Sequence, residues 1–380
     1  MDTTRAGMDD AAFGTLASEL EALFARGVDA PLDDDAFDAL VARAFGWQFE
    51  HNRAYRGFAE GRGAMPGTVA RWTDLPAVPA TAFKHLSLLS GEPAAVEAVF
   101  RTSGTTRGGE RRGEHPVPRL SLYRASALPN FRDHVLPDGA RLPLVSLIPR
   151  PSEAPDSSLS AMMGFVADAL CAPEGGGWFV EAGGRIRQAA LSEALGAAEA
   201  DGRPVLVAGT AFAFVHWLDA MAGEGRRFRL PDGSRVMETG GFKGRSRAMP
   251  REDLYRGLVE RLGVPARRIV NEYGMTELLS QFYEPVMREG RGGDPSARRH
   301  VPPPWVRTRV LDPVTLEPVA DGEAGLLQHV DLANLGSVCA VLTEDRGVRV
   351  GDGFRVLGRV EGAEPRGCSR AMDELLSGAP

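Results

Sequence analysis

Residues 100–115, FRTSGTTRGGERRGEH, bring hydroxyl side chains and glycines together directly after a predicted strand. Ser103, Thr105 and Thr106 supply hydroxyl donors, and Gly104 allows backbone N–H groups to approach an anion closely. Loops of this kind bind phosphate groups, although the common P-loop pattern, G-x-x-x-x-G-K-[ST], is absent from this stretch. For the stretch taken alone, an ordinary surface turn is the alternative interpretation.

A second stretch, NEYGMTELLSQFYE at residues 271–284, also follows a predicted strand. Thr276 can donate to a phosphate oxygen, and Glu277 can bind Mg²⁺, which takes few protein carboxylates together with substrate phosphates. The alternative interpretation is the start of a helix, with Thr276 as the N-cap and Glu277 facing the positive end of the helix dipole.

A third stretch, residues 341–376, contains short strand patterns separated by a GDG turn. Asp345 precedes a predicted β-hairpin that ends at Arg359. A surface hairpin with charged ends is the alternative interpretation of this pair.

Cys368 lies near the end of the sequence, between Arg366 and Arg370. The thiolate is the nucleophilic form of cysteine, and neighbouring cations or a helix N-terminus lower the thiol pKa. Ser369 is predicted to cap a short helix, so the surroundings of Cys368 fit an activated thiol; an incidental tail residue is the alternative. The other two cysteines stand in or next to apolar segments and are predicted to pack in the interior: Cys171 and Cys339.

Other groups could supply a charge or accept a proton. The chain holds 44 cationic side chains, of which two are lysines, Lys84 and Lys243. Lysine and arginine are not interchangeable at a tight anion site, so these two lysines are candidates for such a site. The candidates for a general base are His115, His134 and His216, the last of which is expected in the core or a pocket wall.

The overall composition excludes several classes of function. The net charge is −7 and no basic stripe occurs, which argues against nucleic-acid binding. Three cysteines without a CxxC pair argue against a disulfide framework or a zinc site and favour a reducing, cytoplasmic setting. Residues 204–223 have the length of a membrane span, but Gly209 and Thr210 interrupt them and two polar residues follow. A strand, a turn and a helix are expected there instead.

These groups must be positioned by an α/β fold. Amphipathic helices are predicted at 8–27 and 33–48, and a proline-rich connector ends in a short helix that carries Lys84. From about 95 to 275, apolar strands alternate with helices, one of the strands falling at 177–183. This alternation predicts a doubly wound, mostly parallel sheet with ligands at the carboxyl ends of its strands. The expected divisions are a helical segment 1–50, an α/β core 51–300, a small β-rich lobe 301–360 and a C-terminal tail 361–380 with the cysteine.

The order and spacing of TSGTT, YGMTE and TED…GR resemble the acyl-adenylate-forming ligases. From about residue 45 to the end, the chain is more specifically similar to the LuxE-type acyl-protein synthetases. This resemblance is carried by HNRAYRGFAEGRG, FKHLSLLS, ETGGFKGRSR, NEYGMTELLSQFYE and RGCSRAMDELL. It implies the fold of the adenylate-forming N-terminal domain, with a small β-rich lobe and a truncated C-terminal domain.

The resemblance also implies the role of each motif. The pyrophosphate loop corresponds to Ser103, Gly104, Thr105 and Thr106. The glycine segment on the adenine side corresponds to Gly240, Gly241 and Lys243. The segment that stacks on adenine, contacts the α-phosphate and holds Mg²⁺ corresponds to Tyr273, Gly274, Thr276 and Glu277. The aspartate that accepts from the ribose hydroxyls corresponds to Asp345, and the arginine that follows it corresponds to Arg359. The cysteine that accepts the acyl group corresponds to Cys368, and the first candidate for the general base is His115.

The function implied is ATP-dependent activation of a carboxylic acid, expected to be a fatty acid, with Mg²⁺. The acyl group would then pass to Cys368 as a thioester, for delivery to an acyl reductase or another acceptor protein. Two features depart from the superfamily: Arg107 replaces a glycine of the loop, and too few residues follow Arg359 for the mobile domain with its lysine. Two alternatives stay open, namely a ligase that acylates coenzyme A or a carrier-protein thiol, and a non-catalytic scaffold subunit of a reductase complex.

Overall fold

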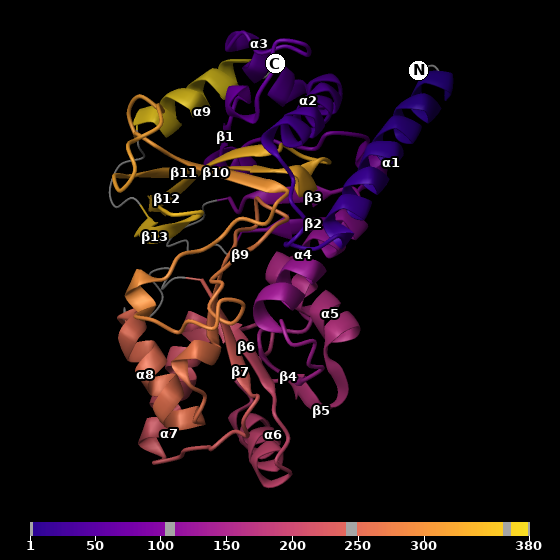
Figure 1. Cartoon of the computed structure of the whole chain (residues 1–380). Coiled ribbons are helices and arrows are strands. Elements are labelled where there is room, and N and C mark those ends of the chain that lie inside the picture. Colours follow the sequence, from indigo (N-terminus) through magenta and orange to yellow (C-terminus); the bar gives the residue numbers. More distant parts are fainter. Residues whose placement is uncertain (1–2, 103–110, 241–248, 360–365, 379–380) are drawn as a thin grey trace.

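Three helices begin the chain, in indigo and purple in Figure 1, and the computed structural model describes residues 3–102, 111–240, 249–359 and 366–378. Asp33 starts the second helix because its side chain accepts a hydrogen bond from the Ala36 amide at 2.8 Å. Asn52 ends that helix and accepts from the Tyr55 amide at 3.0 Å, so the third helix starts at once. The three helices are α1 (Thr3–Ala25), α2 (Asp34–His51) and α3 (Arg53–Gly61).

A six-stranded sheet forms the lower part of the molecule and confirms the predicted doubly wound, mostly parallel fold. Its order is β5-β4-β6-β7-β8-β9, with every neighbouring pair parallel except β8 and β9. The strands are β4 (Pro143–Leu147), β5 (Ala172–Trp178), β6 (Leu206–Thr210), β7 (Arg235–Thr239), β8 (Ile269–Tyr273) and β9 (Phe282–Tyr283).

Helices cover both faces of this sheet. Figure 1 shows α7 and α8 on one side of the strands and α5 on the other. A hydrophobic core lies between the sheet and α6, α7 and α8, and a second core runs from α1–α3 through α4, α5 and α9. The helices are α4 (Leu120–Val135), α5 (Ser158–Leu170), α6 (Gln188–Ala200), α7 (Ala211–Gly223) and α8 (Arg251–Leu262).

The sequence made two specific predictions for the lower sheet, one for residues 204–223 and one for residues 177–183. The apolar stretch 204–223 folds as strand β6 followed by helix α7, as predicted, and no helix within the described residues is long and apolar enough to span a bilayer. The strand predicted at 177–183 is wrong in position, because β5 begins at Ala172 and ends at Trp178. A Cβ at Gly176 would lie 2.4 Å from the Leu144 carbonyl oxygen, so the glycine run lets β5 approach β4 closely.

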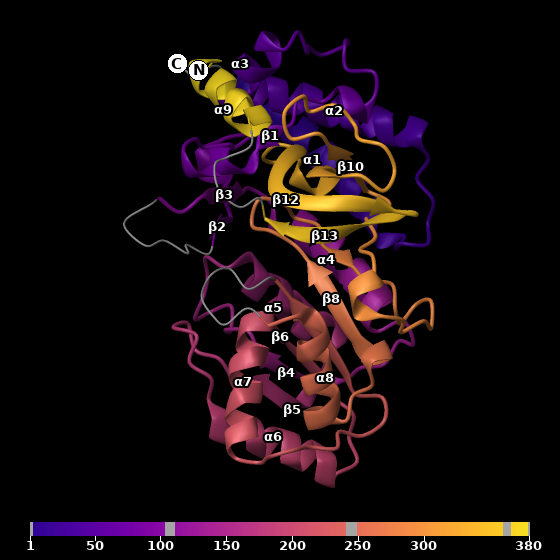
Figure 2. The same cartoon turned by 90° about the vertical axis from the view of Figure 1, so that its left-hand side faces the viewer.

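A five-stranded sheet forms the upper part, with the order β1-β12-β11-β10 and β13 paired to β12 (Figure 2). The predicted hairpin is present as β12–β13 and ends at Arg359, but Asp345 lies within β12, opposite Arg359, rather than before the hairpin. The sheet also takes in β1, whose residues lie far from the predicted lobe 301–360 in the sequence. The strands are β1 (Val78–Pro79), β10 (Val306–Leu311), β11 (Ala324–Asp331), β12 (Ala340–Val350) and β13 (Gly353–Arg359).

Short elements connect these sheets. Strands β2 (Ala98–Arg101) and β3 (Glu114–Val117) form a two-stranded antiparallel sheet on either side of the hydroxyl-rich loop. The short 3-10 helices are η1 (Trp72–Asp74), η2 (Ala80–Lys84), η3 (Pro93–Ala95), η4 (Ala266–Arg268), η5 (Pro295–Ala297) and η6 (Leu332–Asn334).

The C-terminal segment is a docked helix rather than a free tail. Helix α9 (Arg366–Gly378) packs against α3 and β1. Figures 1 and 2 both show it beside α3. Four residues spaced by three or four along one face are buried: Cys368, Ala371, Met372 and Leu375. The prediction that Ser369 caps the helix is wrong, because the helix begins at Arg366, before Ser369.

Candidate active site

Most of the predicted site residues that the structure describes lie where the six-stranded sheet meets the five-stranded one, whereas Cys368 lies on α9. Strands β7 and β8 end side by side here, with Thr239 opposite Glu272. Gly240 follows β7, is exposed and has a φ of 80°, a conformation that favours glycine. Several predicted residues lie outside the described residues: Ser103, Gly104, Thr105, Thr106, Arg107, Gly241 and Lys243.

Tyr273, Asp345 and Arg359 form a chain of polar contacts across the two sheets. The Tyr273 hydroxyl, at the end of β8, donates to Asp345 Oδ2 on β12 at 2.8 Å. Arg359 Nε, on β13, lies 3.5 Å from Asp345 Oδ1. Burial and the neighbouring Asp345 carboxylate raise the pKa of the Tyr273 hydroxyl, so this hydroxyl stays protonated and acts as the donor. Three of the residues that the family resemblance assigned to nucleotide binding are therefore joined by polar contacts.

The segment after β8 is an irregular turn, and the alternative interpretation of a helix capped by Thr276 is wrong. Gly274 stands at its start, where a Cβ would lie 2.2 Å from Glu272 Oε1 and would force that side chain to move. The Glu272 carboxylate is itself buried and accepts a hydrogen bond from the Thr239 hydroxyl. Adjacent strand ends thus fix where the turn begins.

His115 holds the turn from the side of the two-stranded sheet. Its Nδ1 lies 2.7 Å from the Thr276 carbonyl oxygen, and because a carbonyl only accepts, Nδ1 carries the proton. Burial lowers the pKa of His115 to about 4, so the ring is neutral at pH 7. The Phe83 ring packs edge-on against it with centroids 5.4 Å apart. In this arrangement the Nδ1 proton is donated to the Thr276 carbonyl oxygen, and a role of His115 as general base stays a prediction.

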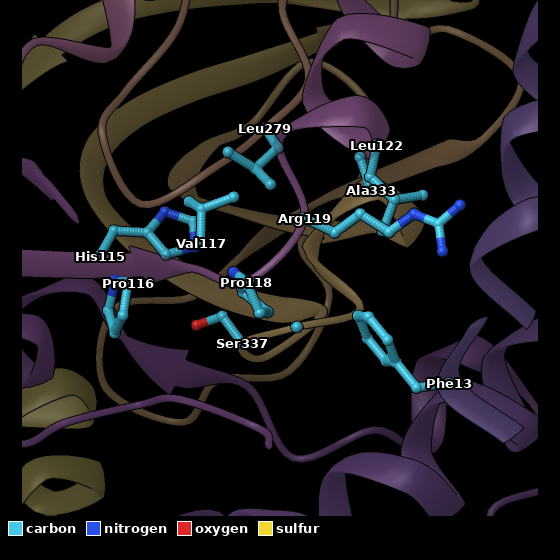
Figure 3. Close-up of a pocket in the computed structure, with 11 residues that line it drawn as sticks. Phe13, His115, Pro116, Val117, Pro118, Arg119, Leu122, Leu279, Ala333 and Ser337 are labelled. Atoms are coloured by element: carbon cyan, nitrogen blue, oxygen red, sulfur yellow. The ribbon is translucent and has the colours of Figure 1, made fainter. Parts of the chain in front are cut away.

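A small cavity lies beside His115 (Figure 3). Its lining includes Leu279 from the turn, Phe13 from α1 and Ser337. Its volume is about 10 Å³, room for about one water molecule and far too little for an acyl chain.

The other two candidate histidines lie elsewhere. His134 is buried in α4, where its Nδ1 lies 2.9 Å from the Asn130 carbonyl oxygen, and burial lowers its pKa to about 4. His216 is exposed on α7 and packs against Phe212, so the expectation of a core or pocket-wall position is wrong. The apolar residues of α7, Phe214 and Trp217 among them, belong to the hydrophobic core.

Glu277 could bind a metal ion only with help from a substrate. Its side chain is largely buried in the turn, close to the end of β8. Within the described part of the chain, no group of three or more His, Cys, Asp or Glu side chains could hold a metal ion by itself. A single carboxylate completed by substrate phosphates is the arrangement that Mg²⁺ accepts, so the residues present fit this ion.

Lys84 ends η2 and is half-buried. This short helix packs against both β3 and β12. Lys84 therefore lies on an element between the strand that follows the hydroxyl-rich loop and the strand that carries Asp345.

Cys368 is the third residue of α9 and is 1% exposed. The guanidinium of Arg370 is directed to Glu374, at 3.7 Å, on the exposed side of the helix. The other cysteines are buried as predicted, and burial raises the pKa of each thiol to about 12: Cys171 and Cys339. At neutral pH these two are thiols rather than thiolates, which fits a packing role.

Sequence reasoning missed two polar residues that contact the turn. Asp331 and Asn334 are both fully buried, at the end of β11 and in η6. The signal that could have revealed them is a pair of polar residues three apart inside the apolar run VDLANLGSVCAVL.

Comparison with known proteins gives a family and a fold. A family model described as "Acyl-protein synthetase, LuxE" matches residues 29–377. Two relatives named long-chain-fatty-acid–luciferin-component ligase come from Vibrio harveyi and Aliivibrio fischeri. Each is 25% identical over 353 residues, which cover 89% of this chain and 87% and 88% of the relatives.

Solved structures of 2-hydroxyisobutyryl-CoA ligase share the fold. The structure in the postadenylation state superimposes with a TM-score of 0.64 and 18% identity, over 88% of this chain and 70% of that one. The structure in the thioesterification state gives a TM-score of 0.63 and 19% identity, over 86% and 68%. At this level of identity, the likeness concerns the fold alone.

Proposed function

The chain belongs to the LuxE family of acyl-protein synthetases, and we propose that it activates a fatty acid with ATP and takes the acyl group onto Cys368. The observation that carries the proposal is the contact of Tyr273 with Asp345 beside the turn that holds Thr276 and Glu277. The relatives named as ligases of long-chain fatty acids support the substrate class.

The first step forms an acyl adenylate. A carboxylate oxygen of the acid attacks the α-phosphorus of ATP, a P–O bond forms, and the bond to the departing pyrophosphate breaks. The carboxyl carbon then carries AMP, a far better leaving group than an oxide. Enzymes accelerate such steps mainly by positioning the reactants and neutralising phosphate charge.

The described residues would share this task. Asp345 would accept hydrogen bonds from the ribose hydroxyls, with the Tyr273 hydroxyl and Arg359 holding its carboxylate in place. Thr276 would donate to the α-phosphate, and Glu277 would bind Mg²⁺, which when bound neutralises phosphate charge.

Further groups are proposed around the phosphates. Lys84, on the element between β3 and β12, is an additional candidate cation. The hydroxyls and glycines of the phosphate loop and of the adenine side would complete the site, together with one lysine: Ser103, Gly104, Thr105, Thr106, Gly240, Gly241 and Lys243.

In the second step the Cys368 thiolate would attack the acyl carbon. A C–S bond forms, the C–O bond to AMP breaks, and AMP leaves with the electron pair. Because Cys368 is buried, α9 would have to move away from α3 and β1 before the thiol could reach the adenylate. The thioester would then be delivered to an acyl reductase.

The test separates the two steps. Cys368→Ala is expected to keep fatty-acid-dependent exchange of pyrophosphate into ATP and to lose covalent labelling by radiolabelled fatty acid. Labelling retained in Cys368→Ala contradicts the assignment of the acceptor. Absence of exchange in the wild-type protein, across fatty, aryl and amino acids, contradicts the proposed activation step.

A second candidate function is transfer of the acyl group to coenzyme A or a carrier-protein thiol. The burial of Cys368 favours it, because an external thiol would not require α9 to move. Formation of acyl-coenzyme A at equal rates by the wild-type protein and Cys368→Ala would support this function over the first.

A further inference from the structure

The turn between β8 and β9 is buried, yet it has little regular secondary structure to satisfy its backbone. Residues 277–281 are all buried. The Leu278 amide donates to the Met275 carbonyl at 3.2 Å, and the other polar groups of the turn need partners from elsewhere. A buried backbone group without a partner destabilises the folded protein, so these partners decide the shape of the turn.

The partners on one side come from the end of β11 and from η6. Asn334 Nδ2 donates to the Glu277 carbonyl oxygen at 2.7 Å. Asp331 Oδ2 accepts from the Leu279 amide at 3.0 Å, and Asp331 Oδ1 accepts from the Ser280 hydroxyl at 2.7 Å. Two side chains thus hold three residues of the turn, and Asn334 holds Glu277 by its backbone carbonyl group.

The opposite side of the turn is held by α4. Asn130 Nδ2 donates to the Gln281 carbonyl oxygen at 2.7 Å. The hydroxyls of Ser126 and Ser280 lie 2.8 Å apart, and the Trp305 indole N–H donates to Ser126 Oγ at 2.9 Å. The turn therefore sits in a cradle made by separate segments of the chain.

The contacts from Asp331 and Asn334 also join the two halves of the candidate site. Asp331 ends β11, Asn334 lies in the connection from β11 to β12, and β12 carries Asp345. Glu277 follows β8, which is a strand of the six-stranded sheet. A hydrogen bond from Asn334 to the Glu277 backbone consequently links the segment of the proposed metal ligand to the sheet that carries the proposed ribose ligand.

We propose that Asn334 and Asp331 are positioning residues, which hold Glu277 at the place where it binds the metal ion of metal–ATP while Asp345 binds the ribose. This inference rests on the proposed function and extends it to residues that touch no substrate. Asn334 acts on the Glu277 carbonyl oxygen, and Asp331 fixes the two residues that follow.

Removal of the Asn334 side chain frees the Glu277 carbonyl group. Asn334→Ala is expected to raise the Mg²⁺ concentration for half-maximal ATP binding roughly tenfold, the effect of losing one buried hydrogen bond. ATP binding is measured by calorimetry without fatty acid, at a series of Mg²⁺ concentrations, so that no reaction is needed. In pyrophosphate exchange, the KM for the fatty acid is expected to stay unchanged.

Gln48→Ala is the matched control. The Gln48 amide donates to the carbonyl oxygens of Asn334 and Leu335, at 3.1 and 3.2 Å, so it supports the same segment from the opposite side. It makes no contact with the turn among its hydrogen bonds to the described residues. Its replacement is expected to lower the melting temperature and to leave the Mg²⁺ requirement unchanged.

Asp331→Asn is the second variant, should Asn334→Ala fail to fold. It keeps the size of the side chain but cannot accept at both oxygens, and it is also expected to raise the Mg²⁺ requirement. Equal Mg²⁺ requirements for Asn334→Ala, Asp331→Asn and Gln48→Ala overturn the inference. Failure of the wild-type protein to bind ATP at any Mg²⁺ concentration overturns the proposed function instead, so the two failures are distinguishable.

Discussion

Arg62, the residue that directly follows α3, pairs with Glu374 of α9, with Arg62 Nη2 at 2.7 Å from Glu374 Oε2. Arg62 Nε donates to the same oxygen at 2.9 Å, and the guanidinium also lies over the Phe58 ring. The pair links α9, the helix that carries the buried Cys368, to the end of α3, against which α9 packs. It is therefore part of what keeps the proposed acceptor thiol out of reach.

Arg62→Ala is expected to make Cys368 more accessible. Both partners are partly exposed, so the pair contributes about 0.5–1 kcal/mol, and its loss raises the rate of thiol modification roughly two- to fivefold. The rate is measured with a chromogenic disulfide, after subtracting the signal of Cys368→Ala. Arg43→Ala is the matched control, because Arg43 forms a similar pair with Glu19 between α2 and α1. Equal rates for the two arginine variants contradict this role for Arg62.

A second prediction concerns Gly367, where the first turn of α9 packs closely against the β10–β11 connection. A Cβ at Gly367 would lie 2.6 Å from Leu316 Cδ2 and 2.9 Å from the Pro313 carbonyl oxygen. The Gly367 amide donates to that same oxygen at 3.0 Å. Gly367→Ala is expected to push the first turn of α9 away from the β10–β11 connection, at a cost of about 1–3 kcal/mol.

Compared with the wild-type protein, Gly367→Ala is expected to show faster modification of the Cys368 thiol and a lower melting temperature. Leu316 has a φ of 61°, which is strained for a bulky residue and relieved by glycine. Leu316→Gly added to Gly367→Ala is expected to restore part of the lost stability, because it removes the clashing side chain. A double variant no more stable than Gly367→Ala would argue against the clash.

The lower sheet could be predicted from the sequence because its signals are local. Strands β4, β6, β7 and β8 are short and each contains neighbouring apolar residues, and each is followed along the chain by a helix or a turn. The pairing of β1 with β12 could not be predicted, since Val78 and Pro79 show no strand periodicity and their partners lie more than 250 residues away. Glycine-rich β5 lacks the apolar run that marks a buried strand.

The sequence identified the residues of the site better than their surroundings. The motifs gave Tyr273, Asp345 and Arg359, which the fold brings into contact. Burial of Cys368 was missed, although the apolar spacing of its helix was visible. Asp331 and Asn334 stand out as polar residues inside an apolar run, but their role could not be predicted, because the partners of their side chains come from the distant turn after β8.

The contact between Tyr273 and Asp345 predicts how nucleotide affinity depends on each group. Asp345→Ala is expected to raise the KM for ATP by about 10–100-fold, since charged hydrogen bonds contribute about 1.5–3 kcal/mol each. Tyr273→Phe keeps the carboxylate and loses one donor to it, so an increase of roughly fivefold is expected. Glu344→Ala is the control, because Glu344 also lies near Arg359, at 3.7 Å. A KM for ATP unchanged in Asp345→Ala contradicts the ribose assignment.

His115 predicts a dependence of stability on pH. Its pKa is about 4 in the folded protein, against 6.5 for an unperturbed histidine. Between these values the unfolded chain binds a proton that the folded protein does not, so the free energy of unfolding falls as the pH falls from about 6.5 to 4. The full contribution is roughly 3 kcal/mol. His115→Asn removes this titration, while its amide can still donate to the Thr276 carbonyl oxygen.

The wild-type protein is therefore expected to lose more stability than His115→Asn when the pH is lowered from 7 to 4.5, as measured by urea unfolding. Other buried histidines with lowered pKa values contribute equally to both proteins and cancel in the difference: His134, His300 and His329. His216→Asn, at an exposed position, is expected to follow the wild-type curve. If the wild-type and His115→Asn curves run parallel across this range, His115 takes up its proton in the folded protein as it does in the unfolded chain. The ring is then not held in the neutral form that donates from Nδ1 to Thr276.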